Sequence, residues 1–358
     1  MRVRMLRAGL SAPGVTAVIP CYNYGHYLRE AVEAVLAQPG VDPHVIIVDD
    51  CSPDGSVDAA RALAAEDDRV TVIAHEVNRG HIATYNDGLA AVTTEYVTLI
   101  SADDLVAPGA LGRAAAVMEA DHRIGMVYGW PLEFSGDTPA PGKDANLPLT
   151  WTHWRGQEWI RLSCFRGRSF ILSPEVVMRT EAVRQLGGYN PELPHSGDLE
   201  YWLRTAAHWD VGRVNGRIQA YYRQHATNMH ATTYAGMPAD LRHRWKAFEY
   251  LAGDDFASVS AAGPRRLRRA RRAMAAEALR LALRELEVTG DEAAALALRE
   301  VGEELGDGHV PGRLARRFNA RLALGRSVRS GALHTAHEGL LRAGNRARWR
   351  IWAMTGVS

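Results

Sequence analysis

The chain has 358 residues, of which 47% are hydrophobic and 23% charged, so it can bury a sizeable core and divide into two domains. Its formal net charge of +1 gives no reason to expect a nucleic-acid partner. Three cysteines, Cys21, Cys51 and Cys164, are too few and too scattered for a disulfide framework or a zinc site, and they indicate a reducing compartment.

The charge is unevenly distributed along the chain. From Ala261 to the end there are 19 Arg, no Lys and 10 acidic residues, a balance of +9 that leaves −8 for the first 260 residues.

No apolar run reaches the roughly 18 residues that a membrane-spanning helix needs, and Met1 to Leu10 lacks the apolar core of a signal peptide. We therefore expect a cytoplasmic protein, with peripheral contact at the inner membrane face as a further option.

Strands and helices alternate through the first hundred residues. Short apolar strands are predicted at residues 15–20, 45–48, 70–74 and 97–100. A turn with Gly25 follows the first strand, and Leu28, Val32 and Val35 then recur at helical spacing. Alternation at this period predicts a parallel sheet with right-handed crossovers.

Paired carboxylates end two of these strands. Asp49 and Asp50 follow the second strand, and Asp103 and Asp104 follow the fourth. Ligands of open α/β sheets bind beyond the carboxyl ends of the strands, and adjacent carboxylates suit Mg²⁺ or Mn²⁺ holding the phosphates of a nucleotide. The alternative is that Asp103 or Asp104 only caps the helix expected near Pro108.

Four motifs in this order and spacing carry a family resemblance: VTAVIPCYNYGHYLREAVEAVLAQ, VIIVDDCSPDGS, NRGHIATYNDGLA and ISADD. Together they resemble the N-terminal half of a family 2 glycosyltransferase. The resemblance continues through SPEVVMRTEAVRQLGGYNPEL, GDLEYWLRTA and YYRQHATN to about Asn228. It implies the GT-A nucleotide-diphospho-sugar transferase fold, a Rossmann-like, mostly parallel α/β sheet flanked by helices, here followed by an all-α C-terminal region.

The resemblance also implies a division of the chain. We expect an N-terminal extension at 1–14, a GT-A domain at 15–235 and a helical C-terminal region at 236–358. Within the GT-A domain, 15–130 would bind the nucleotide sugar and 131–235 the acceptor.

The donor site is the first set of residues that the resemblance implies. A carboxylate such as Asp49 can accept hydrogen bonds from a base N–H or a ribose hydroxyl, and Tyr22 offers a stacking face, although ordinary packing is its alternative role. Arg79 would neutralise the diphosphate. The expected donor-binding residues are Pro20, Tyr22, Asn23, Asp49, Asp50, Asn78, Arg79, Gly80, Ser101, Ala102 and Asp103.

The metal site departs from the family pattern, which is usually Asp-x-Asp. Ser101 stands at the first Asp, while Asp103 matches the second, the position that binds the metal. His225 matches a position that often reaches the metal or the diphosphate, with a plain surface histidine as the alternative. We expect Mn²⁺ or Mg²⁺ bound by Asp103 and His225, and Arg223 beside a phosphate.

Asp198 matches the catalytic base of inverting members, although Gly197 replaces the Glu that commonly precedes it. Such a base takes the proton of the acceptor hydroxyl as its oxygen attacks the anomeric carbon. Its structural alternative is an N-cap of the following helix, and the two roles are compatible. We expect the Glu200 and Arg204 pair to be structural, since the two residues stand four apart on that helix.

The pattern is irregular between Pro131 and Phe170, where three tryptophans, Trp151, Trp154 and Trp159, fall close together. Aromatic rings in a loop-rich segment suit stacking on a sugar or an apolar acceptor, so they are the expected acceptor-binding residues. Packing within a small subdomain is the alternative for at least two of them.

From about Asp240 the chain reads as three or four helices, with apolar residues such as Leu314, Phe318 and Leu322 repeating at four. The run PRRLRRARRAM is either a solvated helix face or a patch for an anionic or membrane surface. A homodimerisation arm fits this region equally well.

These residues predict an inverting glycosyltransferase that moves a sugar from a nucleotide diphosphate, with UDP as the expected nucleotide, to a hydroxyl of a sugar, natural-product, protein or lipid-linked acceptor. One alternative is a catalytically degenerate GT-A scaffold, because Ser101 and Gly197 both fall in catalytic motifs. The other is a nucleotidyltransferase, which would need a Gly-rich, Lys-bearing phosphate loop where this chain has CYNYGHY.

Overall fold

The computed structural model describes residues 2–5, 12–137, 139, 147–226, 228, 236–253, 263–307 and 310–323. The chain forms two compact units. Within the described part, the first unit comprises the residues up to Trp159 together with 171–226, and the second comprises 160–170 and the residues from Asn228 on.

The parallel half of the first unit follows the predicted alternation of strands and helices. Its strands lie side by side in the order β5-β2-β3-β4, and every pair among them is parallel. They are β2 (Gly14–Cys21), β3 (Asp42–Asp49), β4 (Val70–Ala74) and β5 (Tyr96–Leu99). The prediction of a parallel sheet in this half is therefore confirmed, and all four carboxyl ends meet at one edge.

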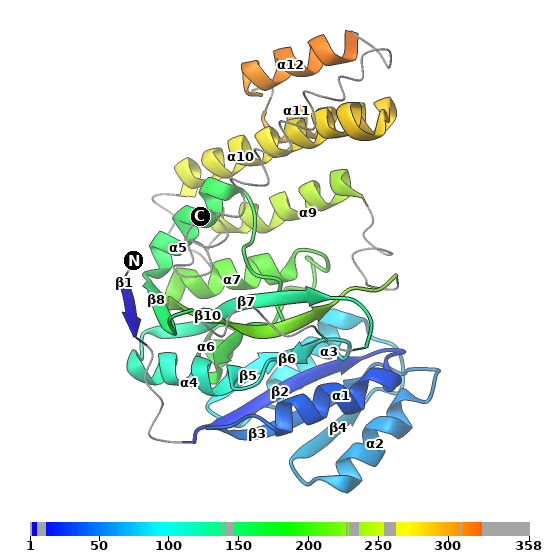
Figure 1. Cartoon of the computed structure of the whole chain (residues 1–358), viewed down its shortest axis with the longest axis vertical. Helices are drawn as coiled ribbons and strands as arrows, with labels where there is room; N and C mark the ends of the chain where they lie inside the picture. Colours follow the sequence, from blue (N-terminus) through cyan, green and yellow to red (C-terminus); the bar gives the residue numbers. More distant parts are fainter. Residues whose placement is uncertain are drawn as a thin grey trace. The chain divides into compact units, whose positions relative to one another are not determined.

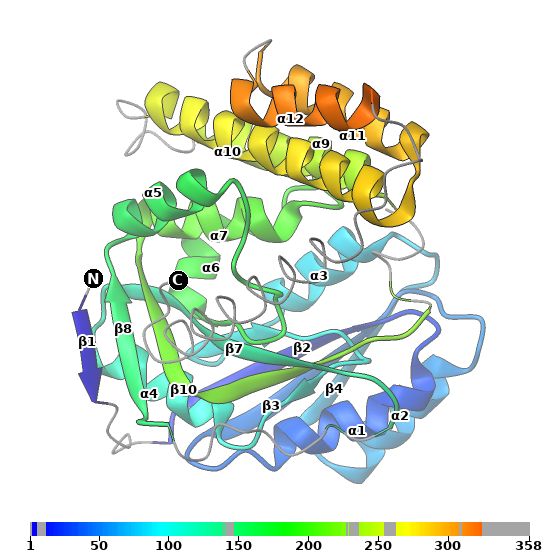
Figure 2. The same cartoon turned by 45° about the horizontal axis from the view of Figure 1, so that its top comes forward.

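Three helices cover this half of the sheet. They are α1 (Gly25–Leu36), α2 (Ser56–Glu66) and α3 (His81–Ala90), with α1 and α2 on one face and α3 on the other (Figure 2). Gly88 allows α3 to lie close to the strands, because a Cβ there would stand 2.4 Å from the Val18 side chain. The buried strand residues read as continuous apolar runs, as expected for a sheet covered on both faces.

The second half of the first unit extends the same sheet with mixed strand directions (Figure 1). Strand β10 runs parallel to β7 but antiparallel to β8 and β6, and β9 joins β5 to β7 antiparallel to both. Strand β1 pairs with β8 at the edge. The elements are β1 (Arg2–Met5), β6 (Leu105–Val106), α4 (Ala110–Ala120), β7 (Ile124–Phe134), β8 (Thr150–Trp154), β9 (Val177–Arg179), α6 (Thr180–Leu186), α7 (Gly197–His208) and β10 (Asp210–Arg223).

Most of the described part of the segment between Pro131 and Phe170 is regular, contrary to the sequence prediction. Residues 131–134 complete β7, 150–154 form β8, and helix α5 spans Gly156–Arg166. Pro131 is tolerated inside a strand, and the tryptophans lie on β8 and α5 instead of on loops.

The described part of the second unit is helical, as the sequence predicts. Helix α10 packs along α11 and also contacts α9 and α12 (Figure 2). Phe318 is fully buried, while Leu314 and Leu322 are half-buried. The elements are α9 (Met237–Glu249), η1 (Tyr250–Ala252), α10 (Gly263–Arg284), η4 (Glu285–Thr289, one turn of π-helix), α11 (Glu292–Leu305) and α12 (Gly312–Ala323). Among the described helices, none combines the length and hydropathy that crossing a membrane requires.

Candidate active site

Asp49, the last residue of β3, is buried with one carboxylate oxygen available. Its Oδ1 accepts a hydrogen bond from the Ser52 N–H at 3.0 Å. Its Oδ2 is buried and has no hydrogen-bond partner among the described residues. A buried acceptor left without a partner is costly unless a ligand satisfies it, so this atom marks a place for a ligand N–H or O–H.

Two residues of left-handed backbone shape the surface above Asp49. Asn23 and Cys51, which follow β2 and β3, have φ of 61° and 59°. The Asn23 N–H donates to Ser52 Oγ at 3.1 Å, which ties the two turns together. Tyr22 is 46% exposed, so its ring is open to a stacking partner. Pro20 precedes it at the end of β2, half-buried.

Asp50 holds the next turn of the site in place. Its carboxylate accepts the N–H groups of Arg79 at 2.7 Å and Gly80 at 2.8 Å, and His75 Nδ1 lies 2.8 Å from it. Burial alone would raise the pKa of Asp50, but these hydrogen bonds outweigh it and lower the pKa. Both oxygens are therefore occupied by the protein, so Asp50 holds the 78–80 turn in place and does not offer a free acceptor.

His75 and Asp87 complete this network and were not predicted from sequence. His75 Nε2 lies 3.0 Å from Asp87 Oδ2, and the same carboxylate pairs with the guanidinium of Arg79. Arg79 remains half exposed, and the Asn78 side chain accepts the Gly80 N–H at 3.2 Å. Nothing in the pattern around His75 distinguishes it from a surface residue.

The turn after β5 brings the expected metal ligands together. Asp103 Oδ2 lies 2.8 Å from His225 Nε2. Asp104 accepts the backbone N–H of Arg223 at 2.9 Å, and burial together with the Asp103 charge raises its pKa well above the ordinary value. Neither carboxylate caps α4, whose N-cap is Gly109, so the capping alternative is wrong. Ser101 and Ala102 lie in the same turn, half-buried and buried respectively.

Arg223 is committed to the protein and does not fit the expected role beside a phosphate. Its guanidinium donates to Glu30 Oε2 at 2.6 Å, to the Gly136 carbonyl at 2.6 Å and to the Asp103 carbonyl at 2.9 Å. The side chain is 3% exposed. Arg223 therefore fixes the Asp103 turn instead of meeting a ligand.

The residues present fit a divalent cation of the magnesium type. Asp103 and His225 point at each other, so their oxygen and nitrogen can share one ion. No third His, Cys, Asp or Glu joins them in the part of the chain that the structure describes. Two protein ligands suffice for Mg²⁺, which usually keeps several waters and binds substrate phosphates.

Asp198 lies in the first turn of α7, whose N-cap is Ser196, so Asp198 is not itself the cap. Its Oδ2 accepts a short hydrogen bond, 2.5 Å, from Ser173 Oγ. Burial raises the pKa of Asp198, and the Ser173 hydrogen bond only partly offsets this. A carboxylate whose pKa is raised toward neutrality is a stronger general base than a surface carboxylate.

The Tyr222 side chain lies near both Asp198 and the turn that holds Asp103 and Asp104. Tyr222 is half-buried, and its pKa is raised by burial and by the charges of Asp104, Asp103 and Asp198. The three carboxylates therefore all act on the Tyr222 hydroxyl.

As predicted, the Glu200 and Arg204 pair is structural: Arg204 Nε donates to Glu200 Oε1 at 2.7 Å inside the protein.

The three expected acceptor-binding tryptophans lie in the interior. Trp151, Trp154 and Trp159 are 2%, 7% and 0% exposed, so none has a ring face open to an acceptor. Trp151 also packs beneath the Arg4 guanidinium at the sheet edge. Their spacing reflected the burial of β8 and α5, and a stacking role on an acceptor is not supported.

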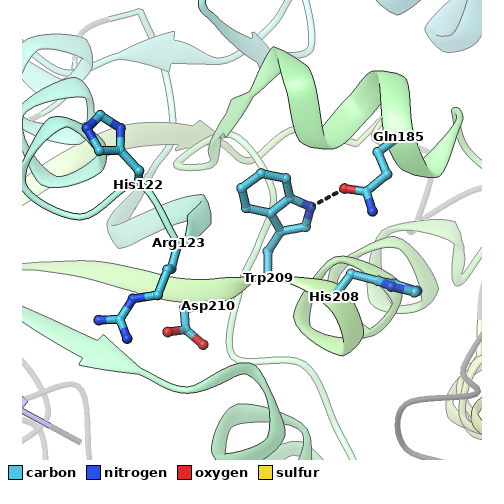
Figure 3. A pocket seen from close by; sticks show the side chains of 6 residues that line it. All are labelled: His122, Arg123, Gln185, His208, Trp209 and Asp210. Carbon is cyan, nitrogen blue, oxygen red and sulfur yellow. Dashed lines mark hydrogen bonds between the residues drawn. The ribbon is translucent and has the colours of Figure 1, made fainter.

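A separate pocket lies at the opposite end of β10 from His225 and contains none of the predicted residues (Figure 3). The Trp209 indole donates to Gln185 there at 2.9 Å. The lining residues are His122, Arg123, Gln185, His208, Trp209 and Asp210. It is distinct from the strand ends where the motif residues meet.

Comparison with known proteins shows which family the chain resembles. Residues 16–187 match the model of glycosyl transferase family 2. The putative glycosyltransferase EpsE of Bacillus subtilis (strain 168) is 32% identical over 208 residues, which cover 54% of this chain and 67% of EpsE. The succinoglycan biosynthesis protein ExoO of Rhizobium meliloti (strain 1021) is 39% identical over 101 residues, or 28% of each chain.

The chain spans 35%, 28% and 40% of the length of the first three curated relatives it matches, the second of which is ExoO. Among solved structures, S. aureus TarS in complex with UDP-GlcNAc superposes with a TM-score of 0.60 at 14% identity, over 85% of this chain and 83% of that one. With the sequence match to EpsE and the fold shared with TarS, the chain belongs to glycosyl transferase family 2 and has the GT-A fold.

Proposed function

We propose that the protein is an inverting glycosyltransferase that moves a sugar from a nucleotide diphosphate, UDP foremost, to an acceptor hydroxyl. The observation that carries the proposal is the Asp198 carboxylate. This carboxylate lies in the first turn of α7, where it accepts a hydrogen bond from Ser173, and burial raises its pKa. Its charge and that of Asp103 both act on the Tyr222 hydroxyl.

The reaction needs one proton acceptor and one leaving group. Asp198 takes the proton of the acceptor hydroxyl while that oxygen forms a bond to the anomeric carbon. The bond from this carbon to the phosphate oxygen breaks, and the nucleotide diphosphate leaves from the opposite face, which inverts the configuration. The first turn of α7 favours the ionised carboxylate before the transfer.

The donor occupies the edge formed by the strand ends. Asp49 Oδ2, buried and without a partner among the described residues, accepts an N–H of the base, and Tyr22 stacks on the base or the ribose. Asn23 and Ser101 lie on the turns that flank this place, and the Asp50 network positions Arg79 for the diphosphate. UDP-GlcNAc in the TarS structure supports a UDP-sugar as the donor.

Asp103 and His225 would hold Mn²⁺ or Mg²⁺ at this edge. Such a cation, when bound, neutralises the charge that develops on the leaving diphosphate. The chain itself orients this pair, because the Asp103 backbone is fixed by Arg223 and the His225 ring lies against the rings of Tyr24 and Tyr27.

The test of the proposal is the variant Asp198→Asn, with turnover followed as release of UDP from a UDP-sugar in the presence of an acceptor or of water alone. We expect donor binding within about twofold of the parent and turnover lower by about 10²-fold or more, the usual range for a lost general base. Undiminished turnover would refute the base assignment. Glu181→Gln, at an exposed carboxylate on α6, is the matched control.

The two alternatives make different predictions. A degenerate scaffold would bind no nucleotide diphosphate, or would bind it without turnover. A nucleotidyltransferase would transfer the nucleotide and release inorganic diphosphate, and the family match counts against this reaction. Identifying the nucleotide product therefore separates all three functions.

The second unit carries a basic face on α10 that supports peripheral membrane contact. No acidic residue occurs from Gly263 to Ala276, and arginines at spacings of three and four residues fall on one side of the helix. An exposed Phe165 lies beside them, with its ring centroid 4.6 Å from the Arg269 guanidinium carbon. The exposed arginines are Arg265, Arg268, Arg269 and Arg272.

We propose that this face binds an anionic lipid surface, to which each Arg contributes about 1 kcal/mol. The full chain should cosediment with vesicles of phosphatidylcholine and phosphatidylglycerol but not with phosphatidylcholine alone. The triple variant Arg265→Gln/Arg268→Gln/Arg272→Gln should lose about tenfold or more in binding. The control Arg61→Gln/Arg313→Gln/Arg316→Gln removes equal charge from exposed sites outside α10, and an equal loss there would overturn the assignment.

A further inference from the structure

A strained turn of the first unit lies beside Asp198. Ser173 has φ of +102°, a conformation that non-glycine residues rarely adopt and that clusters at functional sites. The Ser173 carbonyl accepts the Val176 N–H at 3.1 Å, and Glu175 Oε1 accepts the Leu172 N–H at 2.9 Å. The Glu175 side chain thus bridges the turn on the N-terminal side of Ser173.

This turn determines where the Ser173 hydroxyl points. Its Oγ donates to Asp198 Oδ2 at 2.5 Å, which fixes one oxygen of the carboxylate. The other oxygen is then the one that can meet an acceptor hydroxyl. A small movement of the turn would rotate the carboxylate, and a shift of about 1 Å at a reacting group costs on the order of 10²-fold in rate.

Closing the turn does not account for the whole Glu175 side chain. Oε1 makes the hydrogen bond, but Oε2 is buried and has no hydrogen-bond partner among the described residues. A side chain that served only the turn would need a single acceptor, whereas a buried carboxyl with an unsatisfied oxygen carries a cost. Burial is the main cause that raises the pKa of Glu175 to about 7.

Glu175 and Asp198 lie within electrostatic reach of each other. The Asp198 charge is one of the causes that raise the pKa of Glu175. The other groups that face Glu175 are Arg213, Tyr128 and Asp104. Those that face Asp198 are Ser173, Tyr189, His81, His195 and Tyr222.

We propose that Glu175 is a positioning residue for the Asp198 base: its carboxyl closes the turn that aims the Ser173 hydroxyl at Asp198. The inference rests on the proposed role of Asp198.

The experiment compares Glu175→Gln and Glu175→Ala by kcat and by KM for the donor in UDP-sugar turnover. Glu175→Gln keeps an acceptor for the Leu172 N–H and resembles the protonated carboxyl, so below about pH 7 its kcat should match that of the parent. Glu175→Ala opens the turn, so kcat should fall by about tenfold or more with KM for the donor unchanged.

Three outcomes are informative. An undiminished kcat in Glu175→Ala, with Asp198→Asn inactive, would overturn this inference and leave the proposed function standing. An active Asp198→Asn would refute the proposed base itself. Equal losses of donor affinity and kcat in Glu175→Ala would overturn the positioning role, because they would mean general disruption. Glu181→Gln should match the parent throughout.

Discussion

Asp103 Oδ2 and His225 Nε2 lie 2.8 Å apart, although 122 residues separate them in the chain. The turn after β5 supplies one and the segment after β10 the other. Arg223 joins the two, because its backbone N–H is bound by Asp104 and its guanidinium by the Asp103 carbonyl. Two distant motifs are therefore assembled by one buried arginine.

The first prediction concerns this pair. Asp103→Asn should weaken UDP binding in the presence of Mn²⁺ by about tenfold or more, because it removes the anionic ligand of the cation. With EDTA present, variant and parent should bind UDP alike. Calorimetric titration measures both. Asp42→Asn, at an exposed carboxylate on β3, is the control, and a metal-independent loss in Asp103→Asn would refute the ligand role.

A second prediction tests the available oxygen of Asp49. In Asp49→Asn the side chain can still accept the Ser52 N–H, but the buried Oδ2 acceptor becomes an amide donor. We expect UDP affinity to fall by about tenfold or more, the effect of losing a hydrogen bond to a charged group, with the melting temperature changed by only a few degrees. Unchanged UDP affinity would mean that the base binds elsewhere.

A third prediction concerns the stability that Asp50 supplies. Asp50→Asn should lower the free energy of unfolding by about 2–4 kcal/mol, because an amide nitrogen would meet a backbone N–H that the carboxylate now accepts. The pKa of Asp50 is lowered from 3.8 in the folded protein, so its contribution is present above that pH and is lost as the pH falls through the folded value. Denaturant melts should therefore show a lower free energy of unfolding for Asp50→Asn than for the parent at neutral pH, and this difference should disappear in acid.

The fourth prediction concerns Glu175, whose ionisation lowers the stability of the folded protein, whereas that of Asp50 raises it. The pKa of Glu175 is raised from 4.5 to about 7, so the stabilising protonated form is lost as the pH rises through about 7. Glu175→Gln, which stays neutral, should be more stable than the parent by about 3 kcal/mol above roughly pH 8, and the difference should vanish below about pH 4.5. A pH-independent difference would show that Glu175 does not titrate in this range.

The sequence predicted the parallel half of the sheet because its signals are local. Buried apolar runs, paired carboxylates and glycine turns recur at short spacing, and the strands from β2 to β5 follow them. The mixed strands beyond Pro131 depend on pairing between residues far apart, such as Thr150 with Asn215. Propensity in a short window does not determine such pairing.

The sequence grouped residues that lie together in the fold where a motif named them, and it missed neighbours that only the fold brings together. The pairing of Asp103 with His225 agrees with the sequence prediction. His75, Ser173 and Glu175 were missed, because each stands on a loop with no periodic signal and gains its role from a buried partner. Burial also reversed the prediction for Trp159, since sequence alone does not distinguish a core indole from an exposed one.

The most direct test of the proposed donor site is calorimetric titration of the full chain with UDP, dTDP and GDP, each with Mn²⁺ and again with EDTA. We expect UDP to bind, Mn²⁺ to tighten the binding by about tenfold or more, and EDTA to abolish this gain. Absence of binding by all three nucleotides to the folded protein would contradict the donor site and leave a GT-A scaffold as the better description.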